Sequence, residues 1–478
     1  MPFADFDHFD AMGLAELVRE RHVTPAELVE TVISRIEALN PKLNAVTIKA
    51  YEQARTRAAN PPRNGTFAGV PWLAKDLFTS WPGVPSTGSC SYLKDIVPDH
   101  HSEITRKTEQ AGFILVGKTN VPEFGWCLST EPPFRGVTKN PWDDRLVPGG
   151  SSGGSAVSVA AGILPMADAS DGAGSIRVPA AINGLVGLKP SRGRITFAPD
   201  AADFWHGGAH FFCVSRSVRD SAAFLDCQEG ARPGDPYNTP RPTAPYLSEV
   251  TRGRQGLRIG FSTANPRGDG VSAEVKAAVE GAARTAESLG HYVDEFTFDY
   301  DFERTWNAYN GIIQVETAAY FEFIAGVVGR PVKEDELTRV IWTSKEKGKV
   351  ITGLQHAADI AACRMASRHI ASSLARYDAV LLPTLPKGTR PLGYYDMSMD
   401  IDAYNAGPMG EDNPYMFPFN VSGQPAMSLP LAMSSGGVPI GVQIVGRPAD
   451  EAMLFDLAGQ YELAMPWWHR RPKIHAVA

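Results

Sequence analysis

The chain has 478 residues, of which 43% are hydrophobic and 21% are charged. This balance is typical of a globular protein and excludes a disordered one, and the length allows about three average domains or one large domain. With 46 basic and 53 acidic side chains the net charge is −7, and without a basic tract the chain lacks the electrostatic footprint of a nucleic-acid-binding protein.

The composition also bears on the compartment. The first ten residues, Met1–Asp10, include acidic residues and no apolar core, so no secretory signal is expected. The long uncharged stretches Leu146–Ala167 and Leu429–Gly446 are interrupted by Gly, Ser and Pro, which makes them poor membrane spans. An odd number of cysteines without a CxxC pair favours reduced thiols over disulfides or zinc: Cys90, Cys127, Cys213, Cys227 and Cys363. We therefore expect a cytoplasmic protein with no membrane partner.

The first predicted element is a helix. Thr24 and Glu27 have the spacing of a capping box, and Pro25 lies at the first helical position. Apolar residues follow at helical spacing, and the pair Asn40-Pro41 is expected to end the helix.

Further along, short apolar segments alternate with amphipathic ones, a pattern that favours an α/β sheet covered by helices. The predicted strands are Phe113–Val116, Leu257–Phe261 and Ala379–Leu382, and the predicted helices are Val275–Leu289 and Glu451–Leu463. From 302 to 373 the strand patterns give way to helical ones. We interpret 302–373 as a helical insertion or cap within one domain that spans 1–478.

One short motif match is rejected on physical grounds. Gly112–Thr119 fits the phosphate-loop pattern letter for letter. The four residues between its glycines are Phe, Ile, Leu and Val, which indicate a buried strand and not a glycine-rich cradle for phosphate.

A second match is weak. Gly149–Gly153 fits the G-x-S-x-G nucleophile elbow of α/β-hydrolases, which requires a strand before the serine. The preceding residues, Asn140–Arg145, look like a loop, and helix-forming residues follow the glycines directly. A tight loop leading into a helix N-terminus fits the segment better.

The third match is an ensemble. Lys75 ends the apolar run Gly69–Lys75, Ser151 lies in the Gly/Ser loop 149–155, and Ser175 follows 24 residues later in Asp171–Ala180. This arrangement resembles the amidase signature family of serine hydrolases, and the resemblance extends over nearly the whole chain through Thr138–Asp143, Gly184–Arg194 and Asn420–Pro430. Within the family the chain is most similar to the nylon-oligomer hydrolase branch, notably at Arg232–Asp235 and Phe417–Pro425.

The resemblance implies an amidase signature fold, with a mixed central β-sheet covered by helices on both faces. It also implies a Ser–cis-Ser–Lys triad, in which Ser175 attacks the carbonyl, Ser151 relays the proton and Lys75 is the terminal base. A lysine can act as a base only when it is neutral, and burial against Val70, Trp72 and Leu73 would lower its pKa. No metal and no organic cofactor are implied.

The residues around Ser175 complete the predicted site. Backbone N–H groups of Gly172, Ala173 and Gly174 are expected to form the oxyanion hole. The family more often has Thr-Gly-Gly at these positions, so the Ala173 methyl leaves the geometry of the hole open. The resemblance gives supporting roles to Ser152, Asp171 and Arg177. Arg177 could instead anchor a substrate carboxylate.

Candidate pocket residues come from two segments. Trp306 and Tyr309 lie on an aromatic stripe at helical spacing, for which core packing and pocket lining are both open. Trp126 and Cys127 lie in a stretch that borders the family's substrate site. Trp126 takes the place of a polar side chain that contacts substrate in the nylon-oligomer branch. The expected substrate is therefore an uncharged, fairly bulky small molecule with an amide-type bond, such as an amide, an anilide or a carbamate.

Two other functions remain open at this point. One is the related amidotransferase A-type subunit, which acts on misacylated transfer RNA with partner subunits. The other is a binding module without catalysis. The oligomeric state is not predicted.

Overall fold

The computed structural model describes residues 3–61 and 64–477. Its largest element is an eight-stranded sheet with the strand order β4-β6-β5-β10-β11-β9-β7-β8. β7 is parallel to both β8 and β9, and the other neighbours are antiparallel, so the sheet is mixed. The strands are β4 (Met166–Asp171), β5 (Val186–Lys189), β6 (His210–Ser215), β7 (Arg258–Phe261), β8 (Tyr292–Glu295), β9 (Ala379–Pro383), β10 (Ala426–Met433) and β11 (Pro439–Gly446).

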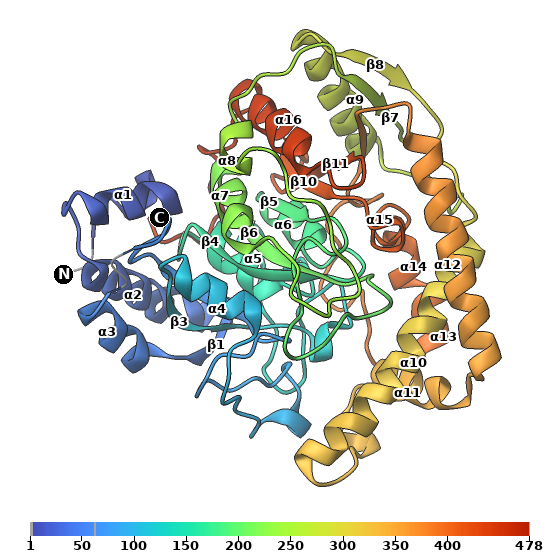
Figure 1. The fold of residues 1–478 in the computed structure, drawn as a ribbon, viewed down its shortest axis with the longest axis horizontal. Coiled ribbons are helices and arrows are strands. Elements are labelled where there is room, and N and C mark those ends of the chain that lie inside the picture. The colour runs from blue at the N-terminus through green and yellow to red at the C-terminus, as the bar shows by residue number, and fades with distance from the viewer. Residues whose placement is uncertain (1–2, 62–63, 478) are drawn as a thin grey trace.

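Helices cover both faces of this sheet. Every residue of β5, β6, β9 and β11 is buried, as expected for strands with helices on both sides. α16 (Glu451–Ala464) contacts β10 and β11, and so does α6 (Arg177–Asn183). The predicted α/β architecture is confirmed (Figure 1). The remaining helices outside 302–374 are α1 (Ala11–Arg19), α2 (Pro25–Leu43), α3 (Tyr51–Ala59), α4 (Glu103–Gln110), α5 (Gly153–Ala160), α7 (Val218–Gln228), α8 (Tyr246–Glu249), α9 (Ala273–Ser288), α13 (Ile401–Ala406), α14 (Pro408–Asp412) and α15 (Phe417–Ser422).

A separate three-stranded sheet positions the buried lysine. Its order is β1 (Val46–Lys49), β3 (Ile114–Thr119), β2 (Pro71–Lys75), with β2 parallel to β3. All five residues of β2 are buried. The main chain of its last residue joins the large sheet, since the Lys75 N–H donates to Asp168 Oδ2 of β4 at 2.9 Å.

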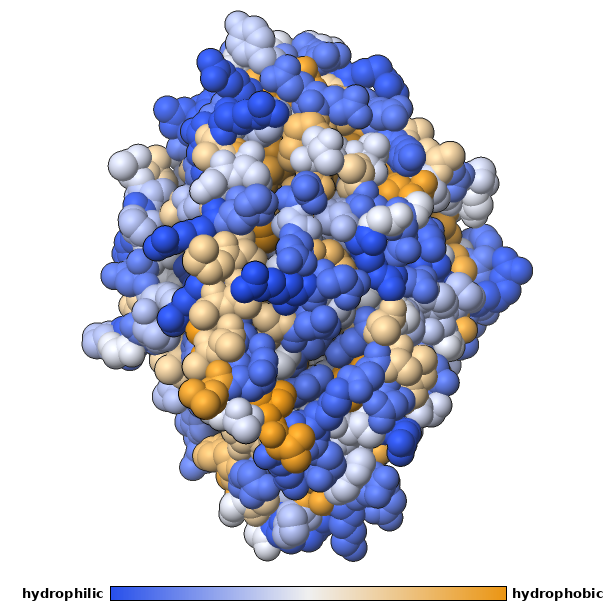
Figure 2. Space-filling view, turned by 90° about the vertical axis from the view of Figure 1, so that its right-hand side faces the viewer, coloured by the Kyte–Doolittle hydropathy of each residue, from blue (hydrophilic) through white to orange (hydrophobic). Residues whose placement is uncertain are grey.

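The segment that the sequence marks as helical contains α10 (Phe302–Val328), α11 (Arg339–Val350) and α12 (Gly353–Leu374), which pack on one another. In the described part of the chain α10 alone is long and apolar enough to cross a membrane by length and composition. These helices lie at the right of Figure 1, and Figure 2 shows this side as mostly hydrophilic with scattered hydrophobic residues. That 302–373 is an insertion or cap stays a prediction.

Most predicted elements are present. β3, β7, β9, α9 and α16 correspond to the predicted segments, and the glycine-rich loop leads directly into α5. Both halves of the Thr24–Glu27 capping box are formed.

The predicted stop at Asn40-Pro41 is wrong, because α2 continues to Leu43 with Pro41 inside its last turn. A proline there removes only one hydrogen bond. The helix ends where Asn44 adopts a left-handed conformation, and the Asn40 side chain accepts the N–H groups of Ala45 and Val46.

Candidate active site

Lys75 has no exposed surface, and its amine is held by two serines. Nζ lies 2.7 Å from Ser151 Oγ and 2.8 Å from Ser170 Oγ, and it also donates to the Ser170 carbonyl at 3.3 Å. The structure thus brings Lys75 and Ser151 together, as the resemblance to the amidase signature family implies, and adds Ser170 of β4, which the sequence analysis missed.

Burial controls the charge of this amine. Desolvation lowers the pKa of Lys75 to about 7, although the charges of Asp168 and Asp171 act in the opposite direction. The neighbouring carboxylate of Asp76 does not engage the amine and instead accepts the Thr87 N–H at 2.8 Å. Above pH 7 the Lys75 amine is therefore largely neutral and able to accept a proton.

Ser151 lies in a tight turn that packs on its neighbours. The Gly150–Ser151 peptide bond is cis. A Cβ on Gly125 would approach Ser151 Oγ to 3.2 Å, so the chain at Gly125 lies directly against this hydroxyl. Ser152 Oγ accepts the Ser170 N–H at 3.2 Å and donates to the Ser170 carbonyl at 3.3 Å, which ties the turn to β4.

Ser175, the predicted nucleophile, lies in residues 171–176, which run from the end of β4 to the start of α6 and which we call the nucleophile loop after that prediction. It is 8% exposed, and in the described chain its hydroxyl makes no hydrogen bond to Ser151 or Lys75. Gly174 has a φ of 112°, so the left-handed conformation falls on a glycine and not on Ala173.

The backbone N–H donors of this loop divide into those that bond to the protein and those that do not. Gly174 N–H is engaged by Asp171 Oδ1 at 2.8 Å, which takes it out of the predicted set of oxyanion donors. In contrast, the N–H groups of Gly172, Ala173 and Ser175 donate to no protein acceptor within residues 3–61 and 64–477. Because no protein group uses them in the described chain, these three donors are available for a ligand oxygen.

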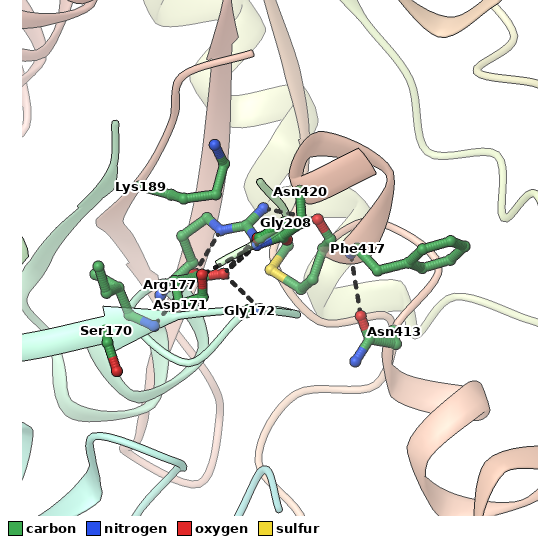
Figure 3. Close-up of polar contacts among 12 residues, drawn as sticks. Ser170, Asp171, Gly172, Arg177, Lys189, Gly208, Asn413, Phe417 and Asn420 are labelled. Carbon is green, nitrogen blue, oxygen red and sulfur yellow. Dashed lines mark hydrogen bonds and ion pairs between the residues drawn. The ribbon is translucent and has the colours of Figure 1, made fainter. Parts of the chain in front are cut away.

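A buried ion pair braces the loop (Figure 3). Arg177 donates to both carboxylate oxygens of Asp171 at 2.9 Å, and Asn420 Nδ2 donates to Asp171 Oδ1 at 2.9 Å. Burial opposes the charge on Asp171, but the adjacent Arg177 guanidinium and these hydrogen bonds hold the pKa of the carboxyl well below its usual range. The remaining Arg177 donors reach Met416 O, Asn420 Oδ1 and Gln443 Oε1. Arg177 is 0% exposed and fully bonded, so it offers nothing to a substrate carboxylate.

The predicted pocket residues divide into two groups. Cys127, Trp306 and Tyr309 are at most 4% exposed and belong to a hydrophobic core cluster. Trp306 Nε1 donates to Asn405 O, and the Tyr309 hydroxyl donates to Gly172 O at 2.6 Å. Trp126 is only partly buried, and it follows Gly125, whose backbone lies against Ser151 Oγ.

Trp205 is a site residue that the sequence analysis missed. It lies in the loop between β5 and β6 with a φ of 56°, and a Cβ on Gly172 would lie 2.0 Å from its ring. The Trp205 indole thus fills the space that a side chain at position 172 would take. The signal in the sequence was Gly172 itself, which stands where the family more often has Thr.

Metal-ligating side chains are not gathered in this region. Among residues 3–61 and 64–477, no group of three or more His, Cys, Asp or Glu side chains is placed to hold a metal ion. The Asp171 carboxylate is used by Arg177, Asn420 and backbone N–H groups of the loop, and the hydroxyls, the Lys75 amine and the remaining N–H groups form a set suited to moving protons and stabilising an oxyanion.

We expect Gly172→Thr to destabilise the protein by about 1–3 kcal/mol, because the new side chain overlaps the rigid Trp205 ring. Adding Trp205→Ala should restore part of the loss. Urea denaturation measures both effects, and Gly281→Ala, on an open part of α9, is the control for a harmless glycine substitution. Full stability of Gly172→Thr would contradict the packing described here.

Comparisons with known proteins agree with this geometry. The Amidase family model matches residues 27–455. The chain is 39% identical to the 6-aminohexanoate-cyclic-dimer hydrolase of Paenarthrobacter ureafaciens, over 97% of this chain and 96% of the relative. It is similar to the solved structure of a 6-aminohexanoate cyclic dimer hydrolase with substrate (TM-score 0.92, 38% identity, 98% and 99% coverage). It is also similar to a bacterial aryl acylamidase of the amidase signature family (TM-score 0.87, 31% identity, 96% of each chain). The chain therefore belongs to the amidase family and is an enzyme that hydrolyses amide bonds.

Proposed function

We propose that this amidase cleaves the C–N bond of an uncharged, fairly bulky amide-type substrate through a Ser175–Ser151–Lys75 triad and an acyl-enzyme. The observation that carries the proposal is the 2.7 Å contact between Ser151 Oγ and the Nζ of a fully buried lysine. A neutral amine within hydrogen-bond distance of a hydroxyl is what a serine nucleophile needs as its base.

The steps follow from these positions. Neutral Lys75 takes the Ser151 proton while Ser151 takes the Ser175 proton, and Ser175 Oγ bonds to the substrate carbonyl carbon. The oxyanion then meets the free N–H groups of the nucleophile loop. Ser151 gives a proton to the leaving nitrogen and takes one back from protonated Lys75, and the C–N bond breaks. Lys75 is then neutral again, and water releases the acyl group from Ser175 by the same relay. Catalytic hydrogen bonds are often long without substrate, which accommodates the unbonded Ser175 hydroxyl.

The preference for an uncharged substrate rests on the surroundings of Ser175. Arg177 is the first residue of α6, directly after the nucleophile loop, and its donors are all used within the protein. The Trp205 indole lies against Gly172 of the nucleophile loop, and Trp126 follows Gly125, whose backbone lies against Ser151. Both indoles are only partly buried and offer apolar faces. The similar proteins named for a cyclic dimer and for aryl amides fit the same preference. A carbamate presents the same carbonyl–nitrogen bond but is less electrophilic, so it should react more slowly.

The transfer-RNA amidotransferase alternative and the non-catalytic alternative are separated from this proposal by one experiment. The isolated single chain should hydrolyse a small amide without partner subunits, transfer RNA or ATP. Inactivity of the pure, folded chain on every small amide tested would favour one of the alternatives.

We expect a fluorophosphonate to form a covalent adduct at Ser175, detected by mass spectrometry of the digested protein. Ser175→Ala should abolish the adduct. Ser155→Ala is the matched control, because this buried hydroxyl near the turn bonds to Thr119 and not to Lys75. Labelling that persists in Ser175→Ala and disappears in Ser151→Ala would identify Ser151 as the nucleophile instead.

We expect kcat/KM to rise about tenfold per pH unit below pH 7 and to level off above it, because Lys75, with its pKa lowered to about 7, must be neutral. Lys75→Ala should lose roughly 10²–10⁴-fold in rate. Lys75→Arg should remain inactive, since a guanidinium stays protonated.

Lys118→Met is the control for the Lys75 variants. Lys118 is also fully buried with a lowered pKa, but its Nζ donates to Thr79 O and not to a serine. The Lys118→Met protein that folds should show the same rise of kcat/KM below pH 7 as the unsubstituted enzyme. An active Lys75→Arg enzyme would disprove the proton relay.

We expect an anilide to have a higher kcat/KM than malonamic acid, with an aryl carbamate slower than the anilide and the cyclic 6-aminohexanoate dimer accepted moderately. The reasons are the Trp205 indole against Gly172, the partly buried Trp126 and the fully bonded Arg177. Steady-state kinetics on the four compounds decides the order. If malonamic acid is the best substrate, a cationic group other than Arg177 binds its carboxylate, and the expected preference for uncharged substrates is wrong.

A further inference from the structure

Tyr309 of α10 contacts the nucleophile loop through a single directed hydrogen bond. Its hydroxyl donates to the Gly172 carbonyl at 2.6 Å, and the residue is 1% exposed. The approach depends on Gly208, where a Cβ would lie 2.3 Å from the Tyr309 oxygen. The sequence suggested core packing or a pocket wall for Tyr309, and neither requires this bond.

The acceptor of this bond belongs to a peptide group with a second role. The Gly172 carbonyl and the Ala173 N–H are the two ends of one planar amide. Donation to the carbonyl draws electron density from the amide nitrogen, so it makes the N–H a stronger donor, and it also fixes the plane in which the N–H points. The Ala173 N–H has no protein acceptor in the described chain and is one of the proposed oxyanion donors.

The donor itself is stable in its protonated form. Burial raises the pKa of the Tyr309 phenol well above its usual range, and the nearby charge of Asp171 acts in the same direction. The hydroxyl therefore keeps its proton across the working range of the enzyme, and the hydrogen bond does not titrate with the Lys75 base.

The same helix holds Gly172 from another side. Glu316, two turns after Tyr309, accepts the backbone N–H of Trp205 at 2.6 Å, and the Trp205 ring lies against Gly172. The Trp205 and Tyr309 rings meet edge to face with centroids 6.3 Å apart. α10 thus fixes both the carbonyl and the Cα of Gly172, so the loop cannot rotate this peptide without breaking contacts to the helix.

We propose that Tyr309 is a positioning residue for the oxyanion: its hydroxyl orients and polarises the Gly172–Ala173 peptide so that the Ala173 N–H stabilises the tetrahedral intermediate. This inference rests on the proposed function, because it requires that the substrate oxygen faces the nucleophile loop after attack by Ser175. Tyr309 acts on the reaction through the peptide and does not touch the substrate.

Tyr309→Phe removes the donor and keeps the ring. We expect kcat to fall about 10- to 100-fold with KM within twofold, since a weakened oxyanion donor costs less than the 10²–10³-fold of a deleted one. Tyr461→Phe is the matched control. The Tyr461 hydroxyl of α16 is also buried and also donates to a backbone carbonyl, that of Ala282 in α9, at 2.9 Å. The kcat of this control variant should stay within twofold of the parent.

A readout on the tetrahedral adduct separates positioning from general damage. A trifluoromethyl ketone forms an oxyanion adduct with the serine, and its Ki in Tyr309→Phe should rise by the same factor by which kcat/KM falls. The Ki of the amine product, which has no oxyanion, should be unchanged. A Ki for the ketone that does not follow kcat/KM would overturn the inference, as would a Tyr309→Phe rate equal to that of Tyr461→Phe.

Two further measurements keep the outcomes distinct. If Tyr309→Phe does not fold, 3-fluorotyrosine at position 309, a stronger donor of nearly the same size, should tighten ketone binding, and an unchanged Ki would overturn the inference. The fluorophosphonate adduct of the parent enzyme tests the proposed function separately. Absence of an adduct at Ser175 means that the triad proposal has failed, whereas an adduct at Ser175 with no effect of Tyr309→Phe means that only the positioning role has failed.

Discussion

Lys75 Nζ is buried completely at the end of β2, and its hydrogen bonds to Ser151 and Ser170 require three segments to meet at one point. Burying an amine is costly unless it is neutral and hydrogen-bonded, so the pKa falls and the hydroxyls become obligatory partners. The two sheets are joined at the same place, because the Lys75 N–H donates to Asp168 of β4. The small sheet therefore carries the proposed base, and the large sheet carries the loop with the proposed nucleophile.

The nucleophile loop is held by two sets of contacts, the Asp171–Arg177 ion pair and the contacts from helix α10. Asp171 and Arg177 form an ion pair without exposed surface, and the pair is stable there because Asn420 and Gln443 complete its hydrogen bonds. From the other side α10 contacts Gly172 through Tyr309 and, by way of Glu316, through Trp205. With Gly174 N–H engaged by Asp171, the N–H groups of Gly172, Ala173 and Ser175 are the loop donors without an acceptor among residues 3–61 and 64–477.

Elements with strong local signals were predictable from the sequence. The Thr24–Glu27 capping box forms as predicted, and the apolar run at 113–116 becomes the buried strand β3, because capping and hydrophobic burial act over a few residues. The end of α2 was not predictable from Pro41, because the cost of a proline in a last turn is small and the side chain of Asn40 and the left-handed Asn44 decide the end.

For the site, the residues Lys75, Ser151 and Ser175 and their spacing were sufficient to assign the family and to name the candidate triad, since each motif is local in the chain. The sequence could not show that Ser170 shares the lysine, that Gly174 N–H is already used or that Trp205 fills the space over Gly172. It also left Arg177 open as a substrate anchor and Tyr309 as a pocket residue. The roles of Arg177 and Tyr309 depend on contacts between segments more than 100 residues apart, such as Tyr309 with Gly172 and Arg177 with Asn420. Only the tertiary structure decides which polar groups remain free once such contacts are made.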